Sequence, residues 1–149
     1  MNFSSEQQKI MYEAAGNLYN AGFNCAEAVF RAFCEHLSLD VPKDALRVAA
    51  GFGGGMSSAE GYCGALTGGI MVLGILAGRT EPTQDKKPMK ELTKDFLQEF
   101  KARFGDLSCG CLNKYENGTP EQKKNCHAIT AGAAALLMRF IEDRQLLRR

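Results

Sequence analysis

The sequence predicts an all-α fold, a single-domain up-down bundle of about five to six helices over residues 1–149 with a central, glycine-rich apolar helix. Three observations lead to this class. Apolar residues recur at helical spacing in several segments, capping residues stand at the segment starts, and no segment alternates as a strand does. With 149 residues, 45% of them hydrophobic, the chain has the size of one ordinary domain with a packed core.

The first two predicted helices are separated by a break at residues 20–22. The first covers residues 5–19 and begins with Ser5 and Gln8 at capping-box spacing. The second begins with another capping box, Asn24 and Glu27, which places Cys25 at its first helical position.

The middle of the chain holds the predicted central helix. A short helix is expected from about Pro42 to Ala50, then a glycine-rich loop over residues 51–55. The apolar segment from about Tyr62 to Gly78 follows, and its small residues favour a buried central position. Residues 61–78 are eighteen positions without a charge, the lower limit for a membrane span. Their many glycines and the lack of flanking anchors favour a bundle core, so membrane insertion is not expected.

The last part of the chain predicts two further helices. A polar linker at residues 82–88 leads into a helix over residues 89–104, with Gly105 as its C-terminal cap. The triplet 109–111, Cys-Gly-Cys, is expected in the loop beyond. The final helix opens at Thr119-Pro120 and runs to roughly Arg144.

Helix parity gathers four of the six cysteines. In an up-down bundle the second, fourth and sixth helices begin at the end where the fifth helix finishes. That end therefore collects Cys25, Cys63, Cys109 and Cys126, the last about 9 Å into its helix. Cys34 lies about 13 Å down the second helix on its apolar face, so we expect it in the core.

The helix starts also suggest a chemistry for these sulfurs. A helix N-terminus favours thiolate over thiol, and thiolate is the form that attacks disulfides and binds metals. Gly61, Gly64, Gly68 and the glycine triplet 53–55 would let backbone N–H groups approach the sulfurs, as an iron–sulfur cluster requires. Alternatively, the cysteines are small buried hydrophobes.

The segment Cys63-Gly64-Ala65-Leu66-Thr67-Gly68 resembles the motif of the C-GCAxxG-C-C family, which is described as redox-active. The likeness runs from Cys25 through Cys63 and Cys109 to Cys126 and covers nearly the whole chain. It implies that these four form the working set, with Cys111 as a substitute for Cys109. Related domains resemble part of a haem cytochrome, but a Cys-x-x-Cys-His motif is missing here, so covalent c-type haem is not expected.

The sequence therefore predicts a redox-active cysteine protein with one of two chemistries. Either the four thiolates hold an iron–sulfur cluster and pass electrons, or they undergo thiol–disulfide exchange. A zinc or copper carrier or sensor and a purely structural helical domain are the alternatives. The expected partner is an electron donor or acceptor protein. Enzymatic activity and a homodimer stay open.

The balance of charges indicates which partners to expect, and the cysteines indicate the cellular compartment. Eighteen Lys and Arg residues stand against seventeen Asp and Glu, without a basic stripe, so a nucleic-acid partner is not expected. The N-terminal residues do not form a secretory signal. Six cysteines then predict a reducing, cytoplasmic location and a metal or redox use.

Overall fold

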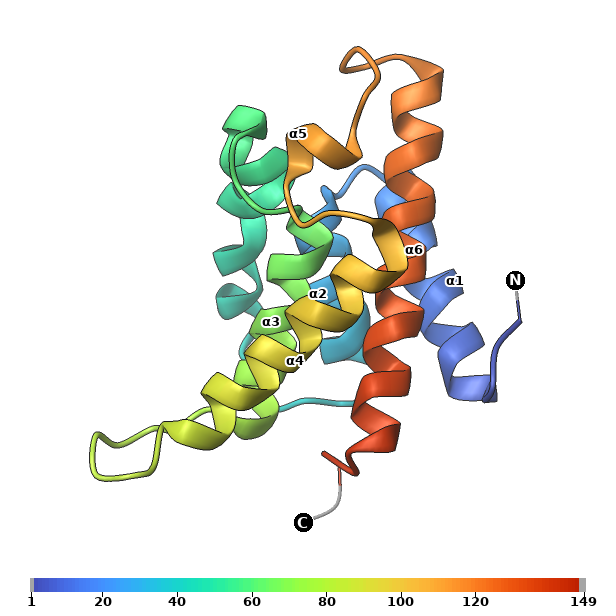
Figure 1. Ribbon diagram of the computed structural model, residues 1–149. Coiled ribbons are helices and arrows are strands. Elements are labelled where there is room, and N and C mark those ends of the chain that lie inside the picture. The colour runs from blue at the N-terminus through green and yellow to red at the C-terminus, as the bar shows by residue number, and fades with distance from the viewer. Residues whose placement is uncertain (1, 148–149) are drawn as a thin grey trace.

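The computed structural model describes residues 2–147 as helices packed around an apolar core (Figure 1). No strand occurs among these residues, which confirms the all-α class. In chain order the elements are α1 (Glu6–Asn20), α2 (Cys25–His36), η1 (Lys43–Phe52), η2 (Gly55–Ala59), α3 (Gly64–Ala77), α4 (Lys87–Phe104), α5 (Cys109–Leu112) and α6 (Pro120–Asp143).

The predicted caps place the starts of α1, α2 and α6. The side chain of Ser5 accepts a hydrogen bond from the N–H of Gln8 at 3.2 Å. Asn24 and Glu27 form both bonds of a capping box, at 2.9 and 3.0 Å. Thr119 caps α6 through the N–H three residues on. These bonds satisfy donors that a helix start leaves without a partner, so the three starts lie within one residue of the prediction.

Two predictions about local structure are wrong. The segment after Pro42 is a 3-10 helix, η1, and it extends two residues into the expected glycine-rich loop. The Cys109–Leu112 segment is not a loop but one helical turn, α5. The N–H of Leu112 donates to the carbonyl of Ser108 at 3.0 Å and closes this turn.

The predicted central helix is α3, which packs against α2, α4 and α6. Its buried residues include Leu66 and Leu73. Glycines make the close approach possible, because a Cβ on Gly68 would lie 2.6 Å from the carbonyl oxygen of Ala26 on α2. Helix α1 packs mainly on α6.

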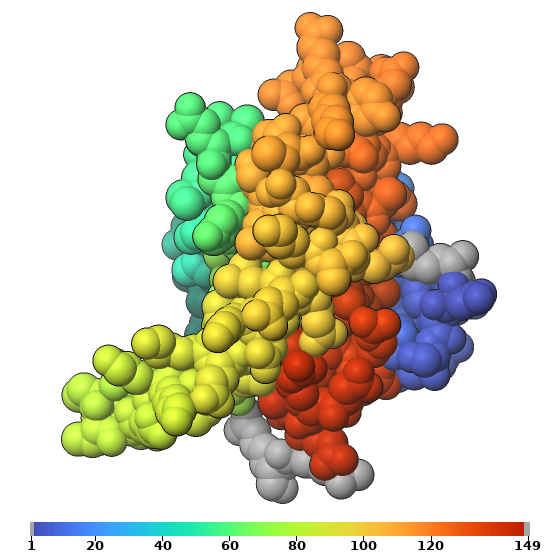
Figure 2. Space-filling model, in the orientation of Figure 1, coloured from blue at the N-terminus to red at the C-terminus, as the bar shows by residue number. Residues whose placement is uncertain are grey.

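The helix ends define the end of the bundle that holds the site. Helices α2, α3 and α6 begin there and α1 finishes there, toward the upper part of Figure 1. The connection between α3 and α4 projects from the opposite region, as Figure 2 also shows. None of the helices in the described part of the chain has the length and apolar character needed to cross a membrane.

Candidate functional site

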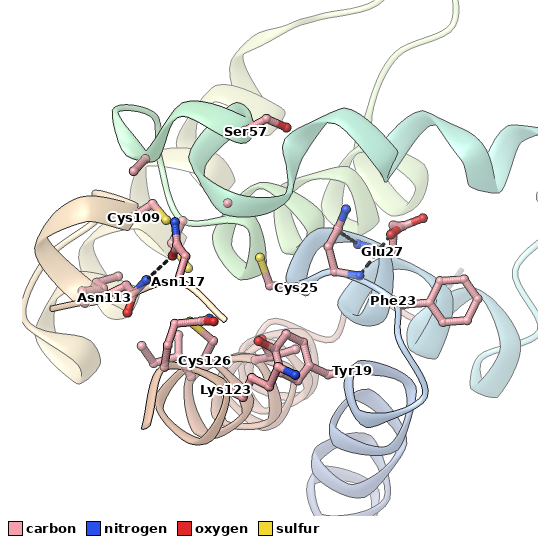
Figure 3. Close-up of a pocket in the computed structure, with 18 of the residues that line it drawn as sticks. Tyr19, Phe23, Cys25, Glu27, Ser57, Cys109, Asn113, Asn117, Lys123 and Cys126 are labelled. Atoms are coloured by element: carbon pink, nitrogen blue, oxygen red, sulfur yellow. Dashed lines mark hydrogen bonds between the residues drawn. The ribbon is translucent and has the colours of Figure 1, made fainter. Parts of the chain in front are cut away.

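A cavity of about 840 Å³ opens among these helix ends and contains four cysteines from four different stretches. We call it the cysteine cavity. Figure 3 shows the labelled cysteines approaching it from separate ribbons, with Tyr19 beside them. Its lining includes Tyr19, Asn24, Cys25, Gly54, Ser57, Cys63, Cys109, Asn117, Gln122, Lys123 and Cys126. The structure thus brings Cys25, Cys63, Cys109 and Cys126 together at one end.

Backbone bonds join the stretches that carry Cys63 and Cys109. The N–H of Cys63 donates to the carbonyl of Leu107 at 2.8 Å, and that of Cys109 donates to the carbonyl of Gly61 at 3.0 Å. Tyr62 and Ser108 form the antiparallel bridge between these two bonds. These two backbone hydrogen bonds fix the relative position of Cys63 and Cys109 independently of any bond between their sulfurs.

Two asparagine side chains fasten the remaining stretches. Asn24, the cap before Cys25, donates from Nδ2 to the carbonyl of Ala50 at 3.0 Å. Asn125, next to Cys126, donates from Nδ2 to the carbonyl of Leu112 at 3.0 Å. These bonds connect α2 to η1 and α6 to α5, so each stretch that carries a cavity cysteine is tied to another element.

A left-handed turn forms one wall of the cavity. Gly54, Gly55, Met56 and Ser57 have φ values of 62°, 64°, 58° and 59°. Two of them carry side chains, for which this conformation costs about 1–2 kcal/mol per residue. A Cβ on Gly55 would lie 2.6 Å from the Cβ of Cys109, so glycine is required there. The turn thus brings backbone close to the sulfurs at the expense of local strain.

Burial opposes the thiolate forms that the helix starts were expected to favour. It raises the pKa of Cys25, although the backbone N–H groups of Gly54 and Ala26 donate to that sulfur and lower it. It also raises the pKa of Cys63 to about 12, with Cys25 adding to the rise and backbone N–H groups opposing it. The expected thiolate stabilisation is therefore wrong for these two, because desolvation outweighs the helix N-terminus.

Cys109 and Cys126 are half-buried, as is Cys25, whereas Cys63 is buried. Burial raises the pKa of Cys109, and Cys25 and Cys126 raise it further. The sulfur of Cys126 accepts a hydrogen bond from Nε2 of Gln122 at 3.1 Å. Charge on one of these sulfurs is therefore felt by the others across the cavity.

The remaining two cysteines lie outside the cavity lining. Cys34 is 7% exposed and belongs to the apolar core, where we expected it. Cys111 is exposed and interacts with the Asp106 carboxylate. Within the 109–111 triplet, the structure directs Cys109 and not Cys111 into the cavity, so Cys111 is not placed as the substitute ligand.

Besides the 53–55 triplet, three glycines were expected beside the sulfurs, and these three have different positions. A Cβ on Gly64 would collide with the sulfur of Cys25. Gly61 supports Cys109 through its carbonyl, and Gly68 packs on α2. None of the three lines the cavity. They permit close packing, while the N–H donors to the Cys25 sulfur come from other residues.

Comparison with known protein families matches residues 23–140 to the family described as "Putative redox-active protein (C_GCAxxG_C_C)". The chain belongs to this family. A protein of Archaeoglobus fulgidus, described as uncharacterized, is 26% identical over 137 residues, 86% of this chain and 91% of that relative. No solved structure matches the chain. All four cavity cysteines lie within the match to the C_GCAxxG_C_C family.

The arrangement of metal-ligating side chains bears on which kind of metal centre the cavity can hold. Among residues 2–147, no three His, Cys, Asp or Glu side chains form a group that could hold a metal ion. In a [4Fe–4S] cluster each of the four thiolates binds a different iron, so the ligand sulfurs lie farther apart than around one ion. The cavity of about 840 Å³ is lined by four cysteine sulfurs, the donor type that iron–sulfur clusters take.

Sequence reasoning missed two contributors to this C_GCAxxG_C_C site, Tyr19 and Gln122. Tyr19 ends α1, and the parity that gathered the cysteines places it at the same end. Gln122 precedes Cys126 by four residues, which puts both on one helix face. The signals for these two were present in the sequence. Gly54 belongs to the glycine triplet 53–55 that was expected to approach the sulfurs, and its N–H does donate to the sulfur of Cys25 from a left-handed turn.

Cys34 provides a test of how burial affects a thiol outside the cavity. Burial, followed by Glu35, raises its pKa from 9.0 to about 11, with Arg31 opposing. Between these pH values the unfolded chain loses the proton and the folded chain keeps it, so stability falls as pH rises. In denaturant unfolding, the stability of wild type relative to Cys34→Ala should therefore shrink from about pH 8 to about pH 10.5. If the difference in unfolding free energy between wild type and Cys34→Ala stayed constant with pH, the pKa of Cys34 would not be raised in the folded protein.

Proposed function

We propose that the protein is an electron-transfer protein in which Cys25, Cys63, Cys109 and Cys126 hold an iron–sulfur cluster. The observation that carries the proposal is the convergence of four sulfurs, each from a different stretch, on one cavity with space between them. When bound, such a cluster accepts and donates single electrons.

The chain supplies backbone donors for a negatively charged centre. N–H groups of Gly54 and Ala26 point to the sulfur of Cys25, and those of Ala65 and Leu66 point to the sulfur of Cys63. Hydrogen bonds of this kind stabilise thiolate ligands and help set the reduction potential of the cluster. The left-handed turn at Gly54 brings one of these N–H donors to the sulfur of Cys25.

The direction of the pKa shifts favours ligation over thiol–disulfide exchange. Exchange requires an accessible thiolate, and Cys63 is 7% exposed with a pKa of about 12. Metal binding removes the thiol protons and stabilises the charge that burial penalises. The metal-free thiol of Cys63 is therefore a poor nucleophile, whereas the same sulfur becomes an anionic ligand once a metal displaces its proton.

Compartment and partner belong to the same proposal. All six cysteines are free in the structure, a state that a reducing compartment such as the cytoplasm maintains. Asn117 and Lys123 line the cavity and are exposed, so an electron donor or acceptor protein would approach the bundle near them.

The test is the visible spectrum of protein prepared without oxygen. We expect broad charge-transfer absorption that bleaches on reduction with dithionite and returns on reoxidation. If the protein stays colourless after incubation with iron and sulfide while its thiols cycle to a disulfide, cluster binding is wrong. Thiol–disulfide exchange would then be the function of the four cysteines.

A further inference from the structure

The amide of Gln122 is held in one orientation against the sulfur of Cys126. Its Oε1 accepts a hydrogen bond from the backbone N–H of Gly118 at 3.1 Å. A backbone N–H can only donate, so this bond identifies Oε1 and leaves Nε2 as the atom that faces the sulfur. Nε2 donates to Cys126 Sγ at 3.1 Å.

The position of this donor is fixed by the start of α6. Thr119 accepts from the backbone N–H of Gln122 at 3.3 Å and so anchors the first turn. Gln122 and Cys126 lie four residues apart, which places their side chains on neighbouring positions of one helix face. The donor and the sulfur therefore move together as parts of one rigid helical segment.

Tyr19 provides a second polar group at the same sulfur. Its hydroxyl hydrogen-bonds with the Gln122 amide and with the Cys126 sulfur. Tyr19 and Cys126 both line the cavity, and the phenol O–H is the donor that the Tyr19 side chain offers there. Figure 3 shows Tyr19 and Cys126 adjacent at the cavity.

The ring of Tyr19 is itself supported by packing between α1 and α6. It meets the ring of His127 edge-on, with centroids 6.2 Å apart. His127 fits against α1 only because Gly16 has no side chain, since a Cβ there would lie 2.8 Å from Nε2 of His127. His127 thus holds the ring of Tyr19 in place from α6.

We propose that Gln122 and Tyr19 are positioning residues that raise the reduction potential of the centre by donating hydrogen bonds to the Cys126 sulfur. This inference rests on the proposed function. Reduction adds one electron, and donors to a ligand sulfur stabilise the more negative, reduced state. Cys25 and Cys63 receive backbone donors, so Cys126 is the ligand whose side-chain donors a substitution can remove.

Two substitutions separate the contributions of these residues. Tyr19→Phe removes one hydroxyl and keeps the ring on His127. Gln122→Glu keeps an oxygen for the Gly118 N–H but turns a second oxygen toward the sulfur. The matched controls are Tyr12→Phe, on the same helix outside the cavity, and Gln98→Glu, an exposed position on α4 with the same change of charge.

The readout is the reduction potential of reconstituted protein, titrated with dithionite and redox dyes. For Tyr19→Phe we expect a shift to more negative potential of about tenfold in the equilibrium constant, about 59 mV for one electron. Gln122→Glu should shift it further in the same direction, and both controls should stay at the wild-type value. Iron–sulfur stretching frequencies in resonance Raman spectra should change in the two variants and not in the controls.

The outcomes distinguish this inference from the proposed function. If wild-type protein binds no cluster, the proposed function fails. If it binds one and both Tyr19→Phe and Gln122→Glu keep the wild-type potential, the positioning role is wrong while ligation stands. A shift in the controls as large as in the variants would also overturn the role, because it would reflect charge or stability alone.

Discussion

Replacing Gly68 by alanine should destabilise the protein by about 1–3 kcal/mol, the usual range for overpacking a core. The added Cβ would lie 2.6 Å from the carbonyl oxygen of Ala26. That oxygen belongs to the backbone of α2, so relief requires α2 and α3 to separate and not merely a side chain to rotate. Denaturant or thermal unfolding of the purified variant measures the loss.

Gly74 supplies the matched control in the same helix. A Cβ there meets nothing within 4 Å. Gly74→Ala should therefore stabilise the protein by up to about 1 kcal/mol, because alanine has the higher helix propensity. The two substitutions make the same chemical change and differ only in their surroundings. Equal effects at both positions would show that α2 and α3 do not approach closely at Gly68.

Replacing Cys25 by serine should abolish iron binding in reconstituted protein. Cys25 is the sulfur that influences the pKa of both Cys63 and Cys109, which places it among the others in the cavity. Serine has nearly the same shape but is a hard oxygen donor, which iron–sulfur clusters rarely accept. Iron per chain after desalting measures the effect.

Cys111→Ser is the control for this experiment. Cys111 is two residues from Cys109 but exposed and outside the cavity lining. This variant should retain the iron content of the wild type. If Cys111→Ser lost its iron and Cys25→Ser kept it, Cys111 would be a ligand and Cys25 would not, contrary to their positions in the structure.

The sequence was sufficient to predict which cysteines converge. The caps Ser5, Asn24 and Thr119 mark helix starts, and short connections then determine which ends lie together. This reasoning placed Cys25 and Cys126 at one end of the bundle, and the structure does the same. It works because helix starts are specified by a few neighbouring residues.

Features that depend on tertiary contacts escaped prediction. The left-handed turn at Met56 and Ser57 contradicts their local preference and exists where Gly55 packs on Cys109. The raised pKa of Cys63 depends on burial by distant segments, whereas the helix-start argument considers only its own turn. The bond from Gln122 required the side-chain orientation that Gly118 fixes.

Iron and acid-labile sulfide, quantified per chain in protein purified without oxygen, test the central claim most directly. The account predicts both elements together in comparable amounts, lost when Cys25 is replaced and kept when Cys111 is replaced. Protein that contains neither element, and takes up neither during anaerobic reconstitution with iron, sulfide and reductant, would contradict a cluster held by the four cavity cysteines.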